Sequence, residues 1–369
     1  MNWSDLFAAR LIQQIYLHQC LKARQLVEQF PHPANLLEIR PAELKHWLPQ
    51  EESQRLWYDA SLRRSIEQEL EWYNRHRVQV VFLHDPNYPK RLKECPDAPI
   101  LLYHLGHSPL EGKRMLAIVG TRSATAYGKQ FVRDLIHSAS QLDPAPIIVS
   151  GLAYGIDIEA HRCCLEHQVQ THAVLANGLD HIYPAAHRNT ARTLLQHGRL
   201  WSEFPKGTPS LPFHFLQRNR IIAGMCDATL LCESSHRGGG MATARQAAAY
   251  NREVFALPGR IHDPHSAGCN ELISNQTASL VSSPEQLWEC LGWNTLKKNQ
   301  TNPKELSIFE CSSELSQTIF RLIGEHACLT PDQLMDLCPQ AGLQDLSIAL
   351  TALELEGLIR QQAGGYTKA

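Results

Sequence analysis

Hydrophobic and polar positions change their spacing along the chain, and each change marks a new segment. In residues 1–77, apolar side chains recur every three to four positions, as in LFAARLIQQIYL and LRRSIEQELEWYNRH. This spacing places the apolar residues on one face of an α-helix. Prolines interrupt the pattern at Pro31, Pro33, Pro41 and Pro49. The segment is therefore predicted to form an N-terminal module of four or five short helices.

Residues 78–282 alternate short β-branched runs with longer amphipathic stretches. MLAIVG is followed by AYGKQFVRDLIHSAS, PIIVSG by IDIEAHRCCLEH, and then comes THAVLAN. Further strands are expected at LWSEF, ATLLCES, EVFALPG and ASLV, and VVFLHD and ILLYHLG extend an edge. Strict alternation of strand and helix signals predicts parallel strands with crossover helices. The expected fold class is α/β, with a Rossmann-like, doubly wound, mostly parallel sheet.

The last part of the chain divides into a polar stretch and a small amphipathic unit. Residues 283–308 are rich in Lys, Asn, Gln and Thr, and we interpret them as a linker. Residues 309–369 contain three helical stretches followed by two strand runs around a Gly-Gly turn, which predicts a winged helix-turn-helix. The third helix carries Asp345, Glu354 and Glu356 without Lys or Arg, whereas a duplex-reading helix is basic. This favours protein contact over duplex DNA contact.

Composition narrows the class of protein only slightly. With 43% hydrophobic residues, 20% charged residues and a net charge of −2, the chain of 369 residues is an ordinary globular protein. No apolar run approaches the roughly 20 residues of a membrane span, and the N-terminus MNWSDLFAAR does not resemble a signal peptide. The 11 cysteines lack paired CxxC spacing and fit reduced thiols. We therefore expect a cytoplasmic protein that does not contact a membrane.

The sequence predicts neither a metal site nor a cofactor. Cys226, Cys232 and His236 have no fourth nitrogen or sulfur ligand nearby, which structural zinc requires. Gly151 and Gly155 do not complete the GxGxxG pattern of dinucleotide binding.

Two strand-to-helix loops carry groups that suit a phosphate. In a doubly wound sheet such loops expose backbone N–H groups beside helix N-termini. The first loop, IVGTRSATAYG, turns at Gly120 and then presents Thr121 and Arg122. The second, VSGLAYGIDIEAH, presents Ser150 and Gly151. Arg122 fits a phosphate clamp as well as a solvated loop position.

The second loop also contains a potential acid/base pair. Asp157 and His161 are four residues apart and hence on one helical face. They fit catalysis, or a carboxylate that stabilises a helix N-terminus beside a packed histidine.

The third loop, HRGGGMATARQAAAY, combines glycines with a helix start. Gly239 and Gly240 allow close approach of an anion to the helix N-terminus. Thr243, in the first part of the same helix, is also a predicted DNA-binding residue. It is not a Walker A loop, because no Lys-Ser/Thr pair follows the glycines.

Upstream of this loop, PFHFLQRNR interleaves aromatic and basic side chains. Phe213 and Phe215 precede Arg218, Asn219 and Arg220. Stacking faces beside guanidinium groups suit single-stranded nucleic acid, although each phenylalanine alone also fits a core position. Residues 214–260 hold a modest excess of positive charge: Arg218, Arg220, Arg237, Arg245, Arg252 and Arg260 against Asp227, Glu233 and Glu253.

Several ordered stretches together resemble the DNA-processing protein A (DprA, also called Smf) family. They are AIVGTRSATAYG, IIVSGLAYGIDIEAH, LANGLDHIYPAAHRN, SEFPKGTPSLPFHFLQRNRIIAG, MATARQAAAYNREVFALPG and AGCNELISNQTASLV, spanning about residues 80–282. The N-terminal module, similar to a sterile-alpha-motif or helix-hairpin-helix module, and the winged helix also resemble longer members.

This resemblance implies a cytoplasmic homodimer, formed through the Rossmann-like domain, that binds single-stranded DNA. It also implies a partner, a RecA-type recombinase that the protein helps to load in natural transformation. By motif, the DNA site would use Gly120, Thr121, Arg122, Ser150, Gly151, Phe215, Arg218, Asn219 and Arg220. Tyr154 and Ala185 depart from the family pattern, where lysines are frequent.

A rival interpretation is a Rossmann-like nucleotide-processing enzyme with GGGMAT and Glu233 at its centre. Such enzymes follow the glycine loop with a catalytic glutamate, and here that position is Gln246, which cannot act as a base. We therefore expect a protein that is not an enzyme.

Overall fold

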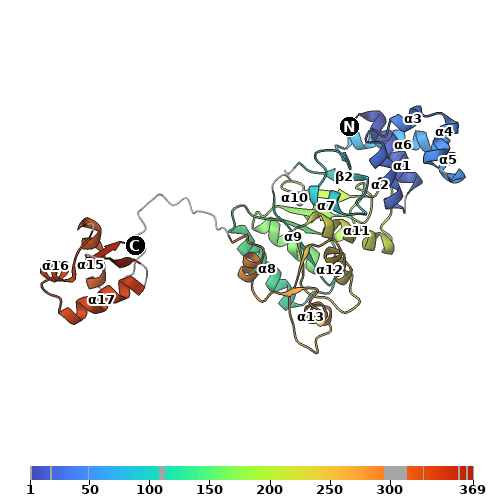
Figure 1. Cartoon of the computed structure of the whole chain (residues 1–369). Coiled ribbons are helices and arrows are strands. Elements are labelled where there is room, and N and C mark those ends of the chain that lie inside the picture. Colours follow the sequence, from blue (N-terminus) through green and yellow to red (C-terminus); the bar gives the residue numbers. More distant parts are fainter. Residues whose placement is uncertain are drawn as a thin grey trace. The chain divides into compact units, whose positions relative to one another are not determined.

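The computed structural model describes residues 2–16, 19–48, 50–107, 113–294, 314–326, 328–355, 358–362 and 365–368. The chain forms two compact units, Met1–Lys298 and Asn299–Ala369 (Figure 1).

The first unit begins with six helices, which confirms the predicted helical N-terminus. They are α1 (Trp3–Ile15), α2 (Cys20–Gln29), α3 (Asn35–Glu38), α4 (Pro41–Trp47), α5 (Glu51–Tyr58) and α6 (Ala60–Arg75). Side-chain caps start two of them: Asn2 accepts from the backbone N–H of Asp5 for α1, and Asp59 accepts from Ser61 and Leu62 for α6. Among the described residues, the buried side chains of these helices belong to the same hydrophobic core as one face of the sheet that follows. The helices therefore do not form a module with a core of its own.

The sheet contains nine strands in the order β1-β2-β6-β5-β4-β3-β7-β8-β9. The strands are β1 (Gln79–Phe82), β2 (Leu101–Leu105), β3 (Met115–Val119), β4 (Ile147–Ser150), β5 (Thr171–Val174), β6 (Arg199–Ser202), β7 (Ala228–Leu231), β8 (Glu253–Ala256) and β9 (Ser279–Leu280). β2 pairs antiparallel with both β1 and β6, and the other pairings are parallel. The expected mostly parallel, doubly wound sheet is confirmed.

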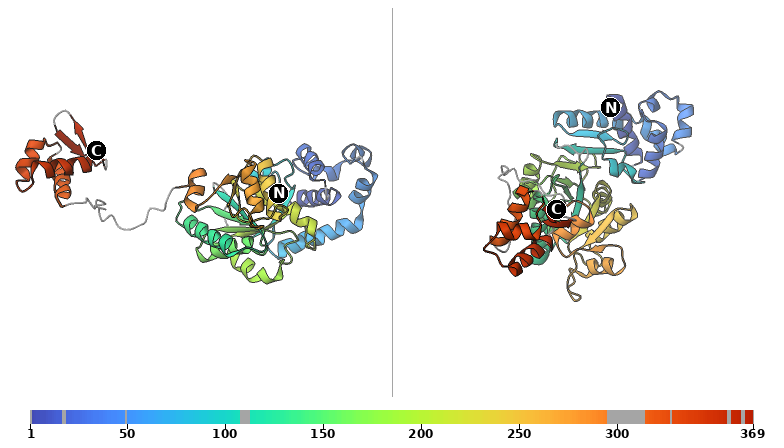
Figure 2. Two further views of the ribbon diagram at one scale, coloured as in Figure 1. Left: turned by 90° about the horizontal axis from the view of Figure 1, so that it is seen from below. Right: turned by 60° about the vertical axis from the view of Figure 1, so that its left-hand side comes forward.

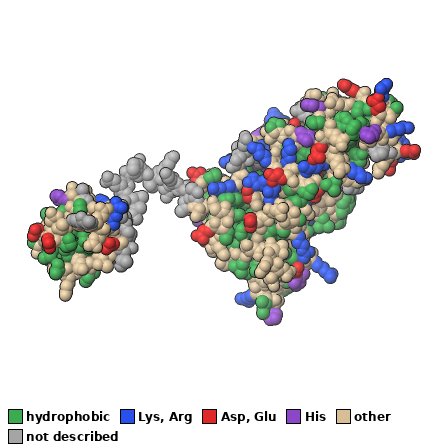
Figure 3. Space-filling model, in the orientation of Figure 1, with side chains coloured by type: hydrophobic (Ala, Val, Ile, Leu, Met, Phe, Trp, Pro, Cys, Tyr) green, Lys and Arg blue, Asp and Glu red, His purple; other side chains and the backbone are tan. Residues whose placement is uncertain are grey.

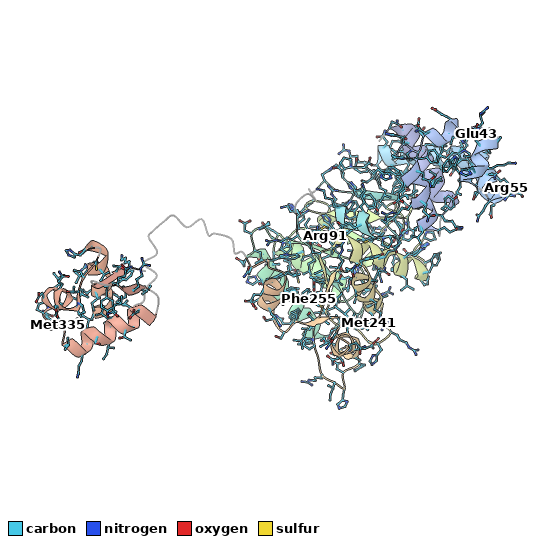
Figure 4. The ribbon with its side chains drawn as sticks, in the orientation of Figure 1. Glu43, Arg55, Arg91, Met241, Phe255 and Met335 are labelled. Atoms are coloured by element: carbon cyan, nitrogen blue, oxygen red, sulfur yellow. The ribbon has the colours of Figure 1, made fainter. Side chains whose placement is uncertain are left out.

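Helices cover both faces of this sheet (Figure 2). They are α7 (Lys90–Glu94), α8 (Ala126–Ser140), α9 (Ile156–Glu166), α10 (Arg188–Leu194, preceded by the 3-10 turn Ala185–His187), α11 (Pro212–Met225), α12 (Gly239–Ala249), α13 (Ala267–Ser274) and α14 (Pro284–Cys290). Strand side chains alternate between two cores, so that Leu116 of β3 packs with α8 and α9 while Ala117 faces α11 and α12. Met241 and Phe255, labelled in Figure 4, belong to these opposite cores.

The chain reverses its direction of winding between β3 and β7. From β3 it proceeds outward through β4, β5 and β6, and then returns so that β7 pairs with β3, as in the register of Leu116 with Ala228. In open parallel sheets such a reversal leaves a crevice at the carboxyl ends of the two strands. The loops after β3 and β7 meet there.

The expected linker at 283–308 is wrong for its first twelve residues. Residues 284–290 form α14, and Trp288 is 2% exposed with its Nε1–H donating to Ser138 Oγ at 2.9 Å. The rings of Trp288 and Trp293 stack at 6.2 Å. The polar average of this stretch concealed large apolar side chains that complete the core over α8. Residues 295–308 lie outside the described part of the chain.

The second unit has the predicted winged-helix order. Helices α15 (Glu314–His326), α16 (Pro331–Leu337) and α17 (Leu343–Leu355) precede the hairpin of β10 (Ile359–Gln362) and β11 (Gly365–Lys368). Ile319, Leu334 and Leu350 belong to its separate core. The third helix exposes Ile348 and Asp345, and Figure 3 shows hydrophobic and acidic side chains side by side on the visible face of this unit.

Within the described ranges, no helix is long and apolar enough to cross a bilayer.

Candidate nucleic-acid interface

A cavity of about 420 Å³ opens where the loops after β3 and β7 meet. Nine of the residues predicted from the sequence line it: Gly120, Thr121, Arg122, Phe215, Arg218, Asn219, Gly239, Gly240 and Thr243. They come from the β3–α8 loop, from α11 and from the start of α12. The fold thus brings together groups that are more than 100 residues apart in the sequence.

Arg218 forms the floor of the cavity and is held from several sides. It is 3% exposed, and its Nη1 donates to the backbone oxygens of Gly151, at 2.7 Å, and Val174. Burial lowers the pKa of Arg218 to about 10, and the Asp157 carboxylate opposes this fall. Arg218 therefore keeps its positive charge at neutral pH but has little freedom to move.

Asp157 is the buried counter-ion of this arginine. Burial raises the pKa of Asp157, while Arg218 and the backbone N–H groups of Ala153 and Gly151 oppose the rise. The Gly151 N–H lies 3.1 Å from Asp157 Oδ2. This carboxylate compensates the charge of Arg218 and leaves the cavity as a whole less positive than its arginines alone imply.

Arg122 lies at the mouth of the cavity and is exposed. Its guanidinium lies 5.1 Å from the centroid of the Phe215 ring, and that of Arg218 lies 5.9 Å from the same centroid. Among the described residues, no carboxylate forms an ion pair with Arg122. Arg122 is thus an uncompensated cation that an aromatic ring orients.

The N-terminus of α12 forms another part of the cavity wall. Its N-cap is Gly238, which has no side chain to bond the first-turn N–H groups. A methyl group at Gly239 would meet nothing within 4 Å, whereas one at Gly240 would lie 2.6 Å from Leu231 Cδ1. Gly239 therefore leaves open space beside the positive end of the helix dipole, and Gly240 permits the helix to pack against β7.

Glu233 shapes the β3–α8 loop from beneath. It is 1% exposed and accepts from the backbone N–H of Thr125 at 2.8 Å and from Thr125 Oγ1 at 2.5 Å. Its backbone oxygen accepts from the Thr121 N–H at 2.7 Å. The enzyme interpretation placed Glu233 at the active centre. In the structure, its carboxylate holds the β3–α8 loop through Thr125.

Four predicted residues do not line the cavity. Ser150 is fully buried and donates to the Ile118 oxygen at 2.6 Å, and Gly151 supports Arg218 from behind, where a methyl group would lie 2.5 Å from its Nη1. Phe213 is 45% exposed and contacts His214. Ser150 and Gly151 therefore support the site without facing it.

Arg220, which was also expected at the DNA site, lies away from the cavity. Arg220 is 9% exposed, pairs with Glu203 and donates to the Asp97 oxygen. Two residues along a helix subtend about 200°, so Arg218 and Arg220 face opposite sides of α11. Only one of them can reach the cavity.

The acid/base pair considered from spacing is not assembled. His161 is fully buried, with Nδ1 at 2.8 Å from Thr171 Oγ1, and burial lowers its pKa to about 3. Asp157 lines the cavity, but His161 does not.

Sequence reasoning missed other lining residues, including Leu216, Ser234 and Ser235. The two serines lie in the loop between β7 and α12 at the switch point, and this position is the signal by which they could have been predicted.

Two family models match the chain. One, for DNA recombination-mediator protein A, covers residues 79–292, and the other, for a DprA winged helix domain, covers residues 303–365. The chain is 34% identical over 281 residues to a putative DNA processing protein DprA of Mycobacterium tuberculosis, which spans 75% of this chain and 70% of that protein. It is 34% identical over 313 residues to protein Smf of Escherichia coli, spanning 83% and 81%.

Two solved structures resemble the fold. The X-ray structure of DNA processing protein A from Streptococcus pneumoniae matches with a TM-score of 0.66 and 27% identity, covering 78% of this chain and 98% of that one. A structure of the Helicobacter pylori protein, described for its single-stranded DNA binding mode, matches with a TM-score of 0.53 and 29% identity, covering 58% and 95%.

Proposed function

The chain belongs to the DNA recombination-mediator protein A family, and we propose that its cavity binds single-stranded DNA. In this proposal a phosphate lies between Arg122 and the N-terminus of α12, and a base stacks near Phe215. One observation carries it: an exposed arginine without a counter-ion among the described residues lies over an aromatic ring, beside an open glycine helix start. Charge for the phosphate and a face for the base are the two requirements of single-strand binding.

The finer function that we propose is recombination mediation. The protein would help to load a RecA-type recombinase on incoming single strands during natural transformation, in the cytoplasm. The support is family membership together with a site that holds a strand through its backbone and base faces. The test is whether the purified protein accelerates assembly of a RecA-type filament on a single strand that is already coated by a single-strand-binding protein.

We propose that the active form is a homodimer through the Rossmann-like domain. The strand β9 ends the sheet, with Leu280 41% exposed, and Ile261 in the loop between β8 and α13 is 84% exposed. An open sheet edge that carries an exposed apolar side chain favours pairing with a second copy. Light scattering of Leu280→Arg against the unaltered protein tests this.

We also propose that the site binds without turnover. Asp157 accepts hydrogen bonds from the backbone N–H groups of Gly151 and Ala153, and Glu233 accepts from Thr125, so neither carboxylate has the freedom that a general base needs. The rival, a nucleotide-processing enzyme, predicts hydrolysis of a nucleotide or of DNA that is lost in Asp157→Asn while the fold is retained. Detecting such activity would favour the enzyme.

The binding proposal is tested by titrating a labelled single strand and competing it with unlabelled single strand, duplex and mononucleotide. We expect the single strand to compete best and the affinity to fall steeply with salt, because phosphate contacts release counterions. Equal competition by a mononucleotide would instead favour a nucleotide site.

A further inference from the structure

Two tyrosines stand exposed on the loops next to the cavity. Tyr154 follows β4 and is 49% exposed, and Tyr183 follows β5 and is 48% exposed. Scattered exposed apolar side chains are common on soluble proteins, so exposure alone identifies no site. The contacts that these two rings make are what sets them apart.

Both rings belong to a series of contacts that ends at the cavity. The Tyr183 ring lies 5.8 Å from the Phe215 ring at an interplanar angle of 62°. The Tyr154 ring lies 4.7 Å from the His187 ring at 68°. His187 is 2% exposed and its Nδ1 donates to the Leu152 oxygen at 2.7 Å, so it is a fixed support.

The turn 183–187 links the two contacts, because it presents Tyr183 at one end and His187 at the other. At angles of 62° and 68° neither tyrosine has a parallel partner in these contacts. Each ring is therefore held by one neighbour while about half of its surface remains exposed.

The strand order shows on which side of the cavity the loops with these tyrosines lie. β5, β4 and β3 are consecutive neighbours, and parallel strands lie about 4.8 Å apart. The loops at their carboxyl ends therefore succeed one another from the cavity toward the β5 side. Ala153, adjacent to Tyr154, lines the cavity itself.

We propose that Tyr154 and Tyr183 form a second nucleobase subsite, which stacks bases of the strand as it leaves the cavity on the β5 side. This inference rests on the proposed function, since it extends the same strand. Aromatic faces bind any base and need no further cation, which suits a strand whose phosphate is already held at Arg122. The subsite thus lengthens the footprint and adds little sequence preference.

The test compares a short and a long fluorescein-labelled oligothymidylate, of about four and about sixteen nucleotides, the range of single-strand site sizes. Tyr154→Ala and Tyr183→Ala should each lose at least about fivefold in affinity for the long strand, which is about 1 kcal/mol for one lost stack. Affinity for the short strand and the salt slope should stay the same, because the cavity and its phosphate contacts are intact. Tyr154→Phe and Tyr183→Phe should bind as the unaltered protein does.

Tyr58→Ala is the matched control, since Tyr58 is also 49% exposed but lies on α5 of the helical module. It should leave both affinities unchanged. Circular dichroism and thermal unfolding verify that every variant is folded.

The outcomes separate the subsite from the proposed function. If Arg122→Ala weakens both strands but the tyrosine variants bind the long strand normally, the subsite is refuted and the cavity proposal stands. If the tyrosine variants weaken short and long strands equally, the rings only position Phe215 and the subsite is refuted. If the unaltered protein binds neither strand, both proposals fail.

Discussion

Replacing Arg122 by alanine isolates the phosphate contact that the proposed function requires. Arg122 is exposed, and the contact that the structure gives its guanidinium is the Phe215 ring at 5.1 Å. An exposed cation–π contact contributes about 0.5–1 kcal/mol, so the variant should fold with nearly unchanged stability. Its effect should fall on binding.

The size of the binding loss follows from the missing charge-assisted hydrogen bonds. Bonds to a charged group are worth about 1.5–3 kcal/mol, and each 1.4 kcal/mol is tenfold, so Kd should rise about 10- to 150-fold. Removing one phosphate contact should also lower the slope of log K against log salt by about 0.7, the value for single strands. Arg122→Lys should recover part of the affinity, because it retains the charge and loses the planar fork.

The assay is fluorescence anisotropy of one labelled oligothymidylate over a salt series. Arg55→Ala is the control, because Arg55 is likewise exposed but lies on α5 of the helical module (Figure 4). If Arg122→Ala is folded and reproduces the Kd and salt slope of the unaltered protein, the phosphate does not bind between Arg122 and α12, and the site is wrong.

Three further sets of perturbations test other parts of the structure. Gly239→Ala should keep or slightly raise stability, by about 0.5–1 kcal/mol, yet weaken strand binding, whereas Gly240→Ala should lower the unfolding temperature through its clash with β7; calorimetry and anisotropy of both variants distinguish them. A chain ending at Asn294 should bind single strands within about tenfold of the whole protein, as measured by anisotropy. A chain ending before α14 should lose about 3–5 kcal/mol of stability by removing Trp288, as measured by urea unfolding. Burial lowers the pKa of His161 to about 3. Between about pH 6.5 and pH 3 this histidine is therefore protonated in the unfolded chain but neutral in the folded chain. The free energy of unfolding should accordingly fall as pH drops from about 6.5 toward 3. His161→Gln should flatten that decline, and an unchanged pH dependence in the variant would contradict it.

Local patterns were sufficient for the elements and for the type of fold. Alternation of β-branched runs and amphipathic stretches predicted the parallel sheet, because a strand buried on both faces must be apolar and its crossover helix must cover it. The three loops that were chosen from glycines and cations are adjacent in the structure, since all lie at carboxyl ends of parallel strands. The linker prediction was wrong for residues 283–294 because Trp288 and Trp293 are two large apolar residues within a mostly polar stretch. Their contribution to the core becomes visible only from their packing against α8.

What the sequence by itself determined was which residue types the site contains and on which loops they lie, because those depend on short-range spacing. What only the tertiary structure decided was which of them face the ligand. Arg218 and Arg220 look equally suited to bind DNA in the sequence. The turn of α11 directs Arg218 to the cavity and Arg220 to Glu203. The electrostatic interaction of Asp157 with Arg218 and the ring contact of Phe215 with Tyr183 likewise depend on strand order, which brings distant segments together.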